Sequence, residues 1–172
     1  MPTAVPDLEF PIDLSSSEDE GVELANDENF CIKYTVKKNQ YGHGIYAAED
    51  IPVGTMIWRF QLGKSAFEFD EQTLPAQLDA MPAEAGVELL DHTYVMSGRI
   101  FFPVGDGGYF NHSLTPNSSV VRSDPLSSTY ALRDIKKGEE ICENYNSYDA
   151  KADWPQWYVK MMHAHGIFDE YF

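Results

Sequence analysis

Cysteine is scarce in this 172-residue chain: Cys31 and Cys142 stand far apart, and neither belongs to a Cys-x-x-Cys pair. This spacing disfavours a disulfide framework and a cysteine-rich structural zinc site. The chain also lacks a run of about 18 apolar residues, and its N-terminus has no basic region followed by an apolar one. We therefore expect reduced thiols in an intracellular protein, without a membrane span or a secretory signal.

Positive charge is also in short supply, because 12 Lys and Arg residues face 28 Asp and Glu residues, for a formal net charge of -16. Residues 1–29 alone hold nine acidic side chains and no Lys or Arg. Binding to a phosphate backbone requires many cationic side chains, so we expect no direct nucleic-acid partner. A basic protein partner fits this charge, although acidity that serves only solubility explains it equally well.

The length suits one compact domain with its own core. Residues 1–29 combine prolines, a serine run and acidic side chains with few apolar residues, which predicts a disordered N-terminal tail. Residues 30–150 form the expected domain, with a helical insertion at about 68–91 that is rich in Ala, Leu and Glu. Residues 151–172 are expected to form an aromatic C-terminal helix.

Short β-branched and aromatic runs, separated by turn signals, fill much of the expected domain. They predict strands at 30–36, 45–48 and 55–60 with a loop through Gly44, and strand character returns from Thr93. Strand follows strand without a helix between the first three. The pattern indicates a mostly β protein, that is, a β-rich α+β fold.

Glycine and proline mark the expected turns and helix ends. The pattern Asp-Ile-x-x-Gly-x-x-Ile occurs at 50–57 and 134–141, and in each copy the glycine predicts a turn that leads into a strand. In the C-terminal segment, Asp153 can cap a helix, Pro155 suits its first turn and Gly166 suits its end.

Three separated segments share the pattern of one protein family. They are YGHGIYAAEDIPVGTMI at 41–57, YFNHSLTPNSSV at 109–120 and RDIKKGEEICENY at 133–145. In order and spacing they resemble the SET-domain protein lysine methyltransferases, of the type without a zinc-binding tail. A Gly-x-Gly is common in turns, whereas Asn-His-Ser-x-x-Pro-Asn with a downstream Glu-Glu-Ile-x-x-x-Tyr is specific. The resemblance covers about residues 30–160.

The resemblance implies the SET fold: several short curved sheets with a knot-like core, a small helical insertion and a C-terminal helix. In that fold the segment of Tyr145 threads a loop near Asn111, a topology that is rare among proteins. It further implies that the aromatic C-terminal helix closes the active site.

The implied activity is transfer of a methyl group from S-adenosylmethionine to a lysine side chain of a protein with a basic segment, such as a histone tail; S-adenosylhomocysteine is the other product. The attacking amine must be neutral, while free lysine has a pKa of about 10.4. A sulfonium about 5 Å away, at an effective dielectric near 20, destabilises the ammonium by roughly 3 kcal/mol, or about two pKa units. The protein's main task is then alignment in a dry channel. By resemblance Tyr145 is the catalytic residue that positions the amine, and Tyr94 lines the lysine channel.

The resemblance also assigns a cofactor site. The amide of Asn111 presents donors and acceptors that suit a zwitterionic amino-acid tail, and main-chain atoms at His112 suit the adenine edge. Glycines without a Cβ let a ligand approach the backbone. Aromatic faces attract cations, so Trp154 or Trp157 is expected to wall the lysine channel or cover the cofactor. The expected cofactor-binding residues are Gly42, His43, Gly44, Tyr46, Tyr109, Asn111, His112 and Trp157.

The chain departs from the family pattern at several positions. Leu114 stands where many histone-directed members have Cys, and no Cys-rich tail follows Tyr145, so we expect no zinc. His163 and His165 would point to different sides of a helix, which disfavours a metal site. Glu143 occupies a position where members often carry Phe or Tyr to set the number of methyl groups added. We expect its carboxylate to point away from the lysine channel.

Two other functions stay open at this point. One is a SET-fold module that binds peptides without turnover, and the other is a methyltransferase for a non-histone protein, which the absent zinc tail allows. The retained Tyr145, Asn111 and Gly-x-Gly favour catalysis. A histone substrate implies a nuclear protein and any other substrate a cytoplasmic one; the chain is expected to be a monomer or a homodimer.

Overall fold

The structure is a computed structural model, and it describes residues 24–120, 128–149 and 151–167. The strands in these residues are β1 (Tyr34–Asn39), β2 (Gly42–Ala47), β3 (Met56–Trp58), β4 (Ala66–Phe69), β5 (Tyr94–Met96), β6 (Arg99–Pro103), β7 (Asn111–His112), β8 (Ser118–Val120), β9 (Thr129–Ala131) and β10 (Cys142–Glu143). The α-helices are α1 (Thr73–Asp79), α2 (Ala83–Asp91) and α3 (Gln156–Ala164), and the 3-10 helices are η1 (Gly105–Tyr109), η2 (Tyr145–Ser147) and η3 (Lys151–Asp153). This strand-rich mixture confirms the expected β-rich α+β class.

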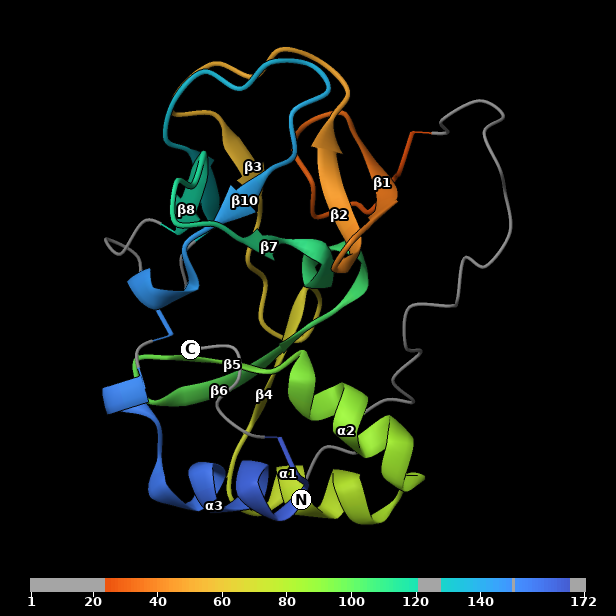
Figure 1. Ribbon diagram of the computed structural model, residues 1–172, viewed down its shortest axis with the longest axis vertical. Helices are drawn as coiled ribbons and strands as arrows, with labels where there is room; N and C mark the ends of the chain where they lie inside the picture. Colours follow the sequence, from red (N-terminus) through yellow and green to blue (C-terminus); the bar gives the residue numbers. More distant parts are fainter. Residues whose placement is uncertain (1–23, 121–127, 150, 168–172) are drawn as a thin grey trace.

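The short sheets fall into two groups, each with its own core (Figure 1). The first group contains β1 with β2, β10 with β7, and β9 between β3 and β8. The second is the sheet in which β6 lies between β4 and β5, with the three α-helices near it in the lower half of the view. Side chains alternate along β6, so Phe101 packs into the first core while Ile100 and Phe102 pack into the second. One strand therefore belongs to both cores.

Both α1 and α2 lie in the helical insertion expected at about 68–91, although the first residues of that range belong to β4. Pro75 stands in the first turn of α1, where a missing backbone N–H leaves no helical hydrogen bond unmade. Pro82 is the N-cap of α2. Fully buried Leu89 and Leu90 then fix α2 against the sheet.

The C-terminal helix α3 ends at Ala164, and Gly166 follows with a φ of 73°, as the glycine predicted. Its start differs from the expectation. Pro155 is the N-cap, whereas Asp153 belongs to η3 and does not cap α3. The short 3-10 turn takes up the residues that were expected to lead into the helix.

Gly44 lies in strand β2 rather than in a loop, which corrects the expectation for the Gly-x-Gly segment. β1 and β2 form an antiparallel hairpin in which Asn39 is opposite Gly42. The turn between them needs a φ of 109° at Gly42, a conformation that glycine adopts without a Cβ clash. Two other expected turns, at Gly54 and Gly138, also have positive φ, of 79° and 89°.

Residues 24–29 pack against the domain. The N–H of Ala25 donates to the carbonyl of Tyr34 at 3.1 Å, and Asn29 is buried. The packed part therefore begins at or before residue 24, inside the range predicted as a tail; residues 1–23 lie outside the described residues. The strand predicted at 30–36 is displaced toward its C-terminal end, because β1 begins only at Tyr34.

Strand β10 is held on two sides, by β7 and by the residues that follow β7. β7 pairs with it in parallel, and the N–H of Ser113 donates to the carbonyl of Glu143 at 2.8 Å. On the other side, the Asn117 side chain accepts from the N–H of Cys142 at 2.9 Å and donates to the carbonyl of Glu140 at 2.7 Å. The chain that leads to Tyr145 thus runs between β7 and Asn117, inside the loop that follows Asn111, as the expected knot-like topology requires.

Candidate active site

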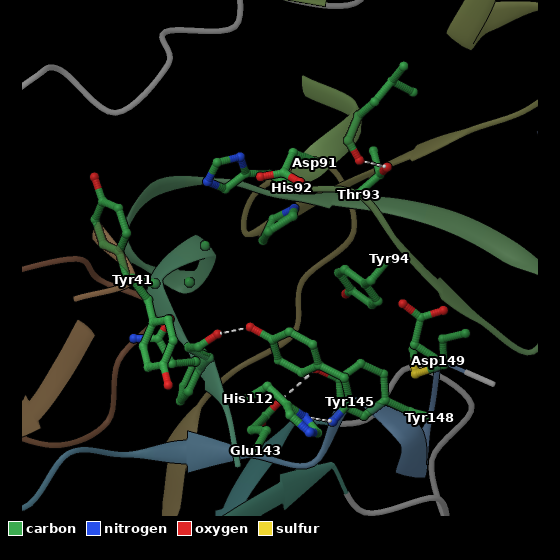
Figure 2. Close-up of a pocket in the computed structure, with 18 of the residues that line it drawn as sticks. Tyr41, Asp91, His92, Thr93, Tyr94, His112, Glu143, Tyr145, Tyr148 and Asp149 are labelled. Carbon is green, nitrogen blue, oxygen red and sulfur yellow. Dashed lines mark hydrogen bonds between the residues drawn. The ribbon is translucent and has the colours of Figure 1, made fainter. Parts of the chain in front are cut away.

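A cavity of about 1270 Å³ is lined by residues from both groups of sheets. Its walls come from the β1–β2 turn, from α2 and β5, from the η1–β7 segment, from η2 and from α3. Figure 2 shows tyrosines, histidines and carboxylates that converge on its centre. These segments lie far apart in the sequence, so the cavity is a product of the tertiary fold.

Seven of the predicted site residues line this cavity. They are Gly42, His43, Tyr94, Tyr109, Asn111, His112 and Tyr145. Gly44, Tyr46 and Trp157 are not among its lining residues. The fold therefore brings the two expected catalytic tyrosines and most of the expected cofactor residues around one space.

Tyr145 lies at the centre of the cavity, at the start of η2. Its hydroxyl donates a hydrogen bond to the carbonyl of Phe110, and its backbone N–H donates to Nδ1 of His112 at 3.2 Å. Burial, followed by the negative charge of Glu143, raises the pKa of the phenol well above its ordinary value. The side chain is therefore a neutral hydrogen-bonding group at physiological pH, suited to position a reactant and unsuited to act as a base.

A second wall of the cavity is aromatic. The ring centroid of Tyr148 lies 6.2 Å from that of Tyr145 and 5.8 Å from that of Tyr94. Burial raises the pKa of Tyr94 and of Tyr148, so both phenols also stay neutral. Rings at these distances contact one another and form a continuous aromatic wall, and aromatic faces attract cations.

The Asn111 side chain joins three segments of the cavity wall: its own, that of His43 and that of Glu140. Its Nδ2 donates to the carbonyl of His43 at 2.9 Å and to Oε1 of Glu140 at 2.7 Å. Glu140 also accepts from Nδ2 of Asn39 at 2.9 Å. Both N–H donors of the Asn111 amide are thus committed to the protein, and a ligand in the cavity would meet its oxygen.

Gly44 lies at the same junction and leaves room for the side chains that meet there. A Cβ at its position would lie 2.4 Å from Oε1 of Glu140 and 2.9 Å from Nδ2 of Asn111. The space beside Gly44 is therefore filled by protein side chains. This finding replaces the expectation that the missing Cβ admits a ligand.

Tyr46 and Trp157 lie elsewhere. Tyr46 is paired with Thr35 in the hairpin, and the Nζ of Lys37 lies 5.0 Å from its ring centroid. Trp157 packs against the second core, whereas Trp154 lines the cavity and donates from Nε1 to Oδ1 of Asp149 at 2.6 Å. Of the two tryptophans offered for the cavity wall, Trp154 is the one that the structure places there.

Glu143 is a buried carboxylate beneath the tyrosines. Its two oxygens accept hydrogen bonds from Thr129 Oγ1 at 2.8 Å and from the hydroxyl of Tyr148 at 2.9 Å. Burial raises its pKa, while these two donors lower it. It lines the cavity floor, with each oxygen turned to a protein donor, as Figure 2 shows for the bond to Tyr148.

Sequence reasoning missed Tyr148 and Asp149 as cavity residues. Both follow Tyr145 within a few positions, in a stretch without a periodic pattern. The 3-10 turn η2 folds the chain back, with the N–H groups of Tyr148 and Asp149 both donating to the carbonyl of Tyr145, at 3.1 and 2.8 Å. Proximity to the expected catalytic residue was the available signal for them.

The described residues lack two features. Within them, no group of three or more His, Cys, Asp or Glu side chains is arranged to hold a metal ion. In the same part of the chain, no helix is long and apolar enough to cross a membrane.

Comparison with known proteins places the chain in a family. The family profile described as the SET domain matches residues 42–146, more than half of the chain. The variant-silencing SET domain-containing protein of Plasmodium falciparum (isolate 3D7) is 29% identical over an alignment of 133 residues, and the match covers 69% of this chain and 5% of that protein. The present chain thus spans a small part of its relative's length.

A solved structure is also similar. The crystal structure of a Plasmodium falciparum protein, described as a proposed histone methyltransferase, has 22% identity and a TM-score of 0.45, and the match covers 66% of this chain and 93% of that one. From the profile match, this chain belongs to the SET-domain family and has the SET fold.

Proposed function

We propose that this protein transfers a methyl group from S-adenosylmethionine to a lysine side chain of another protein. The observation that carries the proposal is the place of Tyr145: its hydroxyl donates to the carbonyl of Phe110, next to Asn111, and its ring centroid lies 6.2 Å from that of Tyr148 in the aromatic wall. Tyr145 thus contacts both a polar half and an aromatic half of the same cavity.

The polar half fits a nucleoside with an amino-acid tail. It offers main-chain groups at Gly42, His43 and His112, the oxygen of Asn111 and the ring of Tyr109, whose centroid lies 5.4 Å from that of His43. A cavity of about 1270 Å³ has room for such a ligand and for a lysine side chain together. When bound, S-adenosylmethionine supplies an electrophilic methyl group on a cationic sulfur.

In the aromatic half, the residues of this chain align the amine and exclude water. Tyr94 and Tyr148 wall the space that a lysine side chain would enter, and the hydroxyl of Tyr145 fixes where its nitrogen stops. Because these three phenols keep their protons, they act by position and by hydrogen bonding.

A protein substrate with a basic segment, such as a histone tail, fits the charge of the cavity. Four carboxylates line it, from Glu88, Asp91, Glu143 and Asp149, against one ammonium, from Lys151. The formal net charge of -16 for the whole chain favours the same class of partner. A non-histone protein with a similar segment satisfies these features equally.

The test is transfer of labelled methyl from S-adenosylmethionine to core histones and to a hypomethylated cell lysate. We expect label on a lysine, and a loss of roughly 100-fold or more for Tyr145→Phe, because the amine loses its alignment. Tyr130→Phe is the matched control, since Tyr130 pairs in β9 outside the cavity. Cofactor binding without any label would favour a peptide-binding module, and absence of both would overturn the proposal.

A further inference from the structure

Asp149 is a carboxylate in the cavity wall that belongs to no motif of the sequence. Its residue is 5% exposed, yet it lines the cavity. Its backbone N–H donates to the carbonyl of Tyr145 at 2.8 Å, so its position is tied to the backbone of Tyr145. Figure 2 shows its carboxylate beside Tyr94 and Tyr148.

Two neutral donors hold this carboxylate in place. Nε1 of Trp154 donates to Oδ1 at 2.6 Å, and the backbone N–H of Val95 also donates to the carboxylate. A carboxylate has about four acceptor positions, so two donors leave it able to take more. Neither Lys nor Arg is among the groups that shift the pKa of Asp149. The carboxylate is thus oriented by two neutral donors.

The neighbours of Asp149 are suited to an organic cation. Its charge reaches the phenols of Tyr94, Tyr145 and Tyr158, since it raises the pKa of each. A carboxylate at the edge of aromatic faces combines the two groups that bind an alkylammonium. In Glu143 a side-chain donor stands at each oxygen, Thr129 at Oε1 and Tyr148 at Oε2, whereas Trp154 donates to Oδ1 of Asp149.

We infer that Asp149 binds the ε-ammonium group of the incoming lysine side chain and so selects a cationic substrate; this rests on the proposed function. The carboxylate favours the charged form of the amine, which must lose its proton before methyl transfer. Asp149 is therefore a substrate-binding residue whose effect falls on KM for the acceptor more than on kcat.

The test uses n-butylammonium as a probe for the lysine side chain and 1-butanol as its neutral control. Binding is followed by nitrogen NMR of the Trp154 indole N–H, which is bonded directly to Asp149. The chain has three tryptophans, and Trp154→Phe identifies the resonance. We expect n-butylammonium to bind roughly 10- to 100-fold more tightly than 1-butanol, as for a hydrogen bond to a charged group.

Two carboxamide variants separate the roles of the carboxylates. Asp149→Asn keeps an acceptor for Trp154 and removes the charge, so the preference for n-butylammonium should disappear, and KM for core histones should rise by a similar factor. Glu143→Gln is the matched control in the same cavity and should keep the preference. An unchanged preference in Asp149→Asn, or equal losses in both variants, would overturn the inference.

A measurement on the unmutated protein covers the case in which Asp149→Asn does not fold. The pKa of Asp149 is raised to about 6, chiefly by burial, whereas an alkylammonium stays charged up to about pH 10. The preference for n-butylammonium should therefore fall as pH drops below about 6, and a preference that stays constant to pH 4 would contradict the inference. Titratable residues that line the same cavity include Tyr94 on β5, Glu143 on β10, Tyr145 on η2, Tyr148 after it, Lys151 on η3 and His163 on α3. The charge of Asp149 also raises the pKa of Tyr158 on α3.

The outcomes also distinguish this inference from the proposed function. Probe binding that depends on Asp149, without label on any protein, would support the ammonium site and contradict the methyl-transfer proposal for the substrates used. Label on histones with an unchanged KM in Asp149→Asn would support the enzyme and overturn the role of Asp149.

Discussion

Asn111 illustrates how one side chain can hold several segments at a site. Its amide joins β7 to the carbonyl of His43 in β2 and to Glu140, which precedes β10. Gly44 leaves the room that these side chains occupy. The amide and the glycine were both expected to meet a ligand; in the structure the N–H donors of the amide and the space beside the glycine are taken by the protein itself.

The burial of Asp149 makes the free energy of unfolding depend on pH. Its pKa rises from the ordinary 3.8 to about 6, because burial disfavours the ionised form. The native state binds this proton more tightly than the unfolded state, so the free energy of unfolding falls as pH rises from about 4 to about 6. A rise of about two pKa units corresponds to roughly 3 kcal/mol.

We expect Asp149→Asn to be as stable as the unmutated protein near pH 4 and more stable by up to about 3 kcal/mol at pH 7. The measurement is urea unfolding of both proteins across this range. Other buried acids, such as Asp106, contribute equally to both proteins and cancel in the difference. A difference that does not change with pH would show that the ionised carboxylate is not destabilising.

At the scale of elements, the short strand β10 depends on side chains more than on sheet pairing. Only Cys142 and Glu143 pair with β7, and Asn117 supplies the contacts on the other side. Asn117 is 4% exposed, so water cannot replace its two hydrogen bonds. Since Tyr145 follows β10 directly, this one side chain helps to fix where the central phenol lies.

Asn117→Ala should therefore lower the free energy of unfolding by about 2 to 4 kcal/mol, because it leaves the N–H of Cys142 and the carbonyl of Glu140 without their partner. Chemical unfolding measures this loss. Ser118→Ala is the graded control: it removes one bond, from Oγ to the carbonyl of Cys142 at 3.0 Å, and should cost about 1 kcal/mol. Equal losses in the two variants would contradict this account of β10.

On the scale of the whole molecule, the cavity lies where segments from two cores meet. β2 and β7 belong to the first group of sheets, while β5 and α3 belong to the second. A ligand that contacts both groups stabilises the native state by mass action, because the unfolded chain offers no such site.

S-adenosylhomocysteine at about 100 times its Kd should thus add about 2.7 kcal/mol to stability. For a chain of this length the gain corresponds to a rise in Tm of roughly 5 to 10 °C. Thermal unfolding with and without the compound measures it, and Asn111→Ala, compared with its own ligand-free Tm, should show a smaller rise. An unchanged Tm for the unmutated protein would count against the cofactor proposal.

Local patterns predicted much of the fold. The prolines and the Ala-rich and Leu-rich stretch located the helical insertion, and Gly54, Gly138 and Gly166 marked turns that do have positive φ. These features depend on a few neighbouring residues, so a single sequence contains them. The boundary at residue 30, the loop at Gly44 and the helix cap at Asp153 differed, because each depends on contacts with distant segments or on competing local turns.

By itself, the sequence determined the class of the fold, through three separated segments whose order matches one family, and it named the tyrosine that lies at the centre of the cavity. Only the tertiary structure decided which tryptophan lines the cavity and that Glu143 and Asp149 are buried there with different partners. The physical reason is that a motif records residue types at fixed spacing, whereas burial and hydrogen-bond partners arise when α3, β5 and η2 enclose one space.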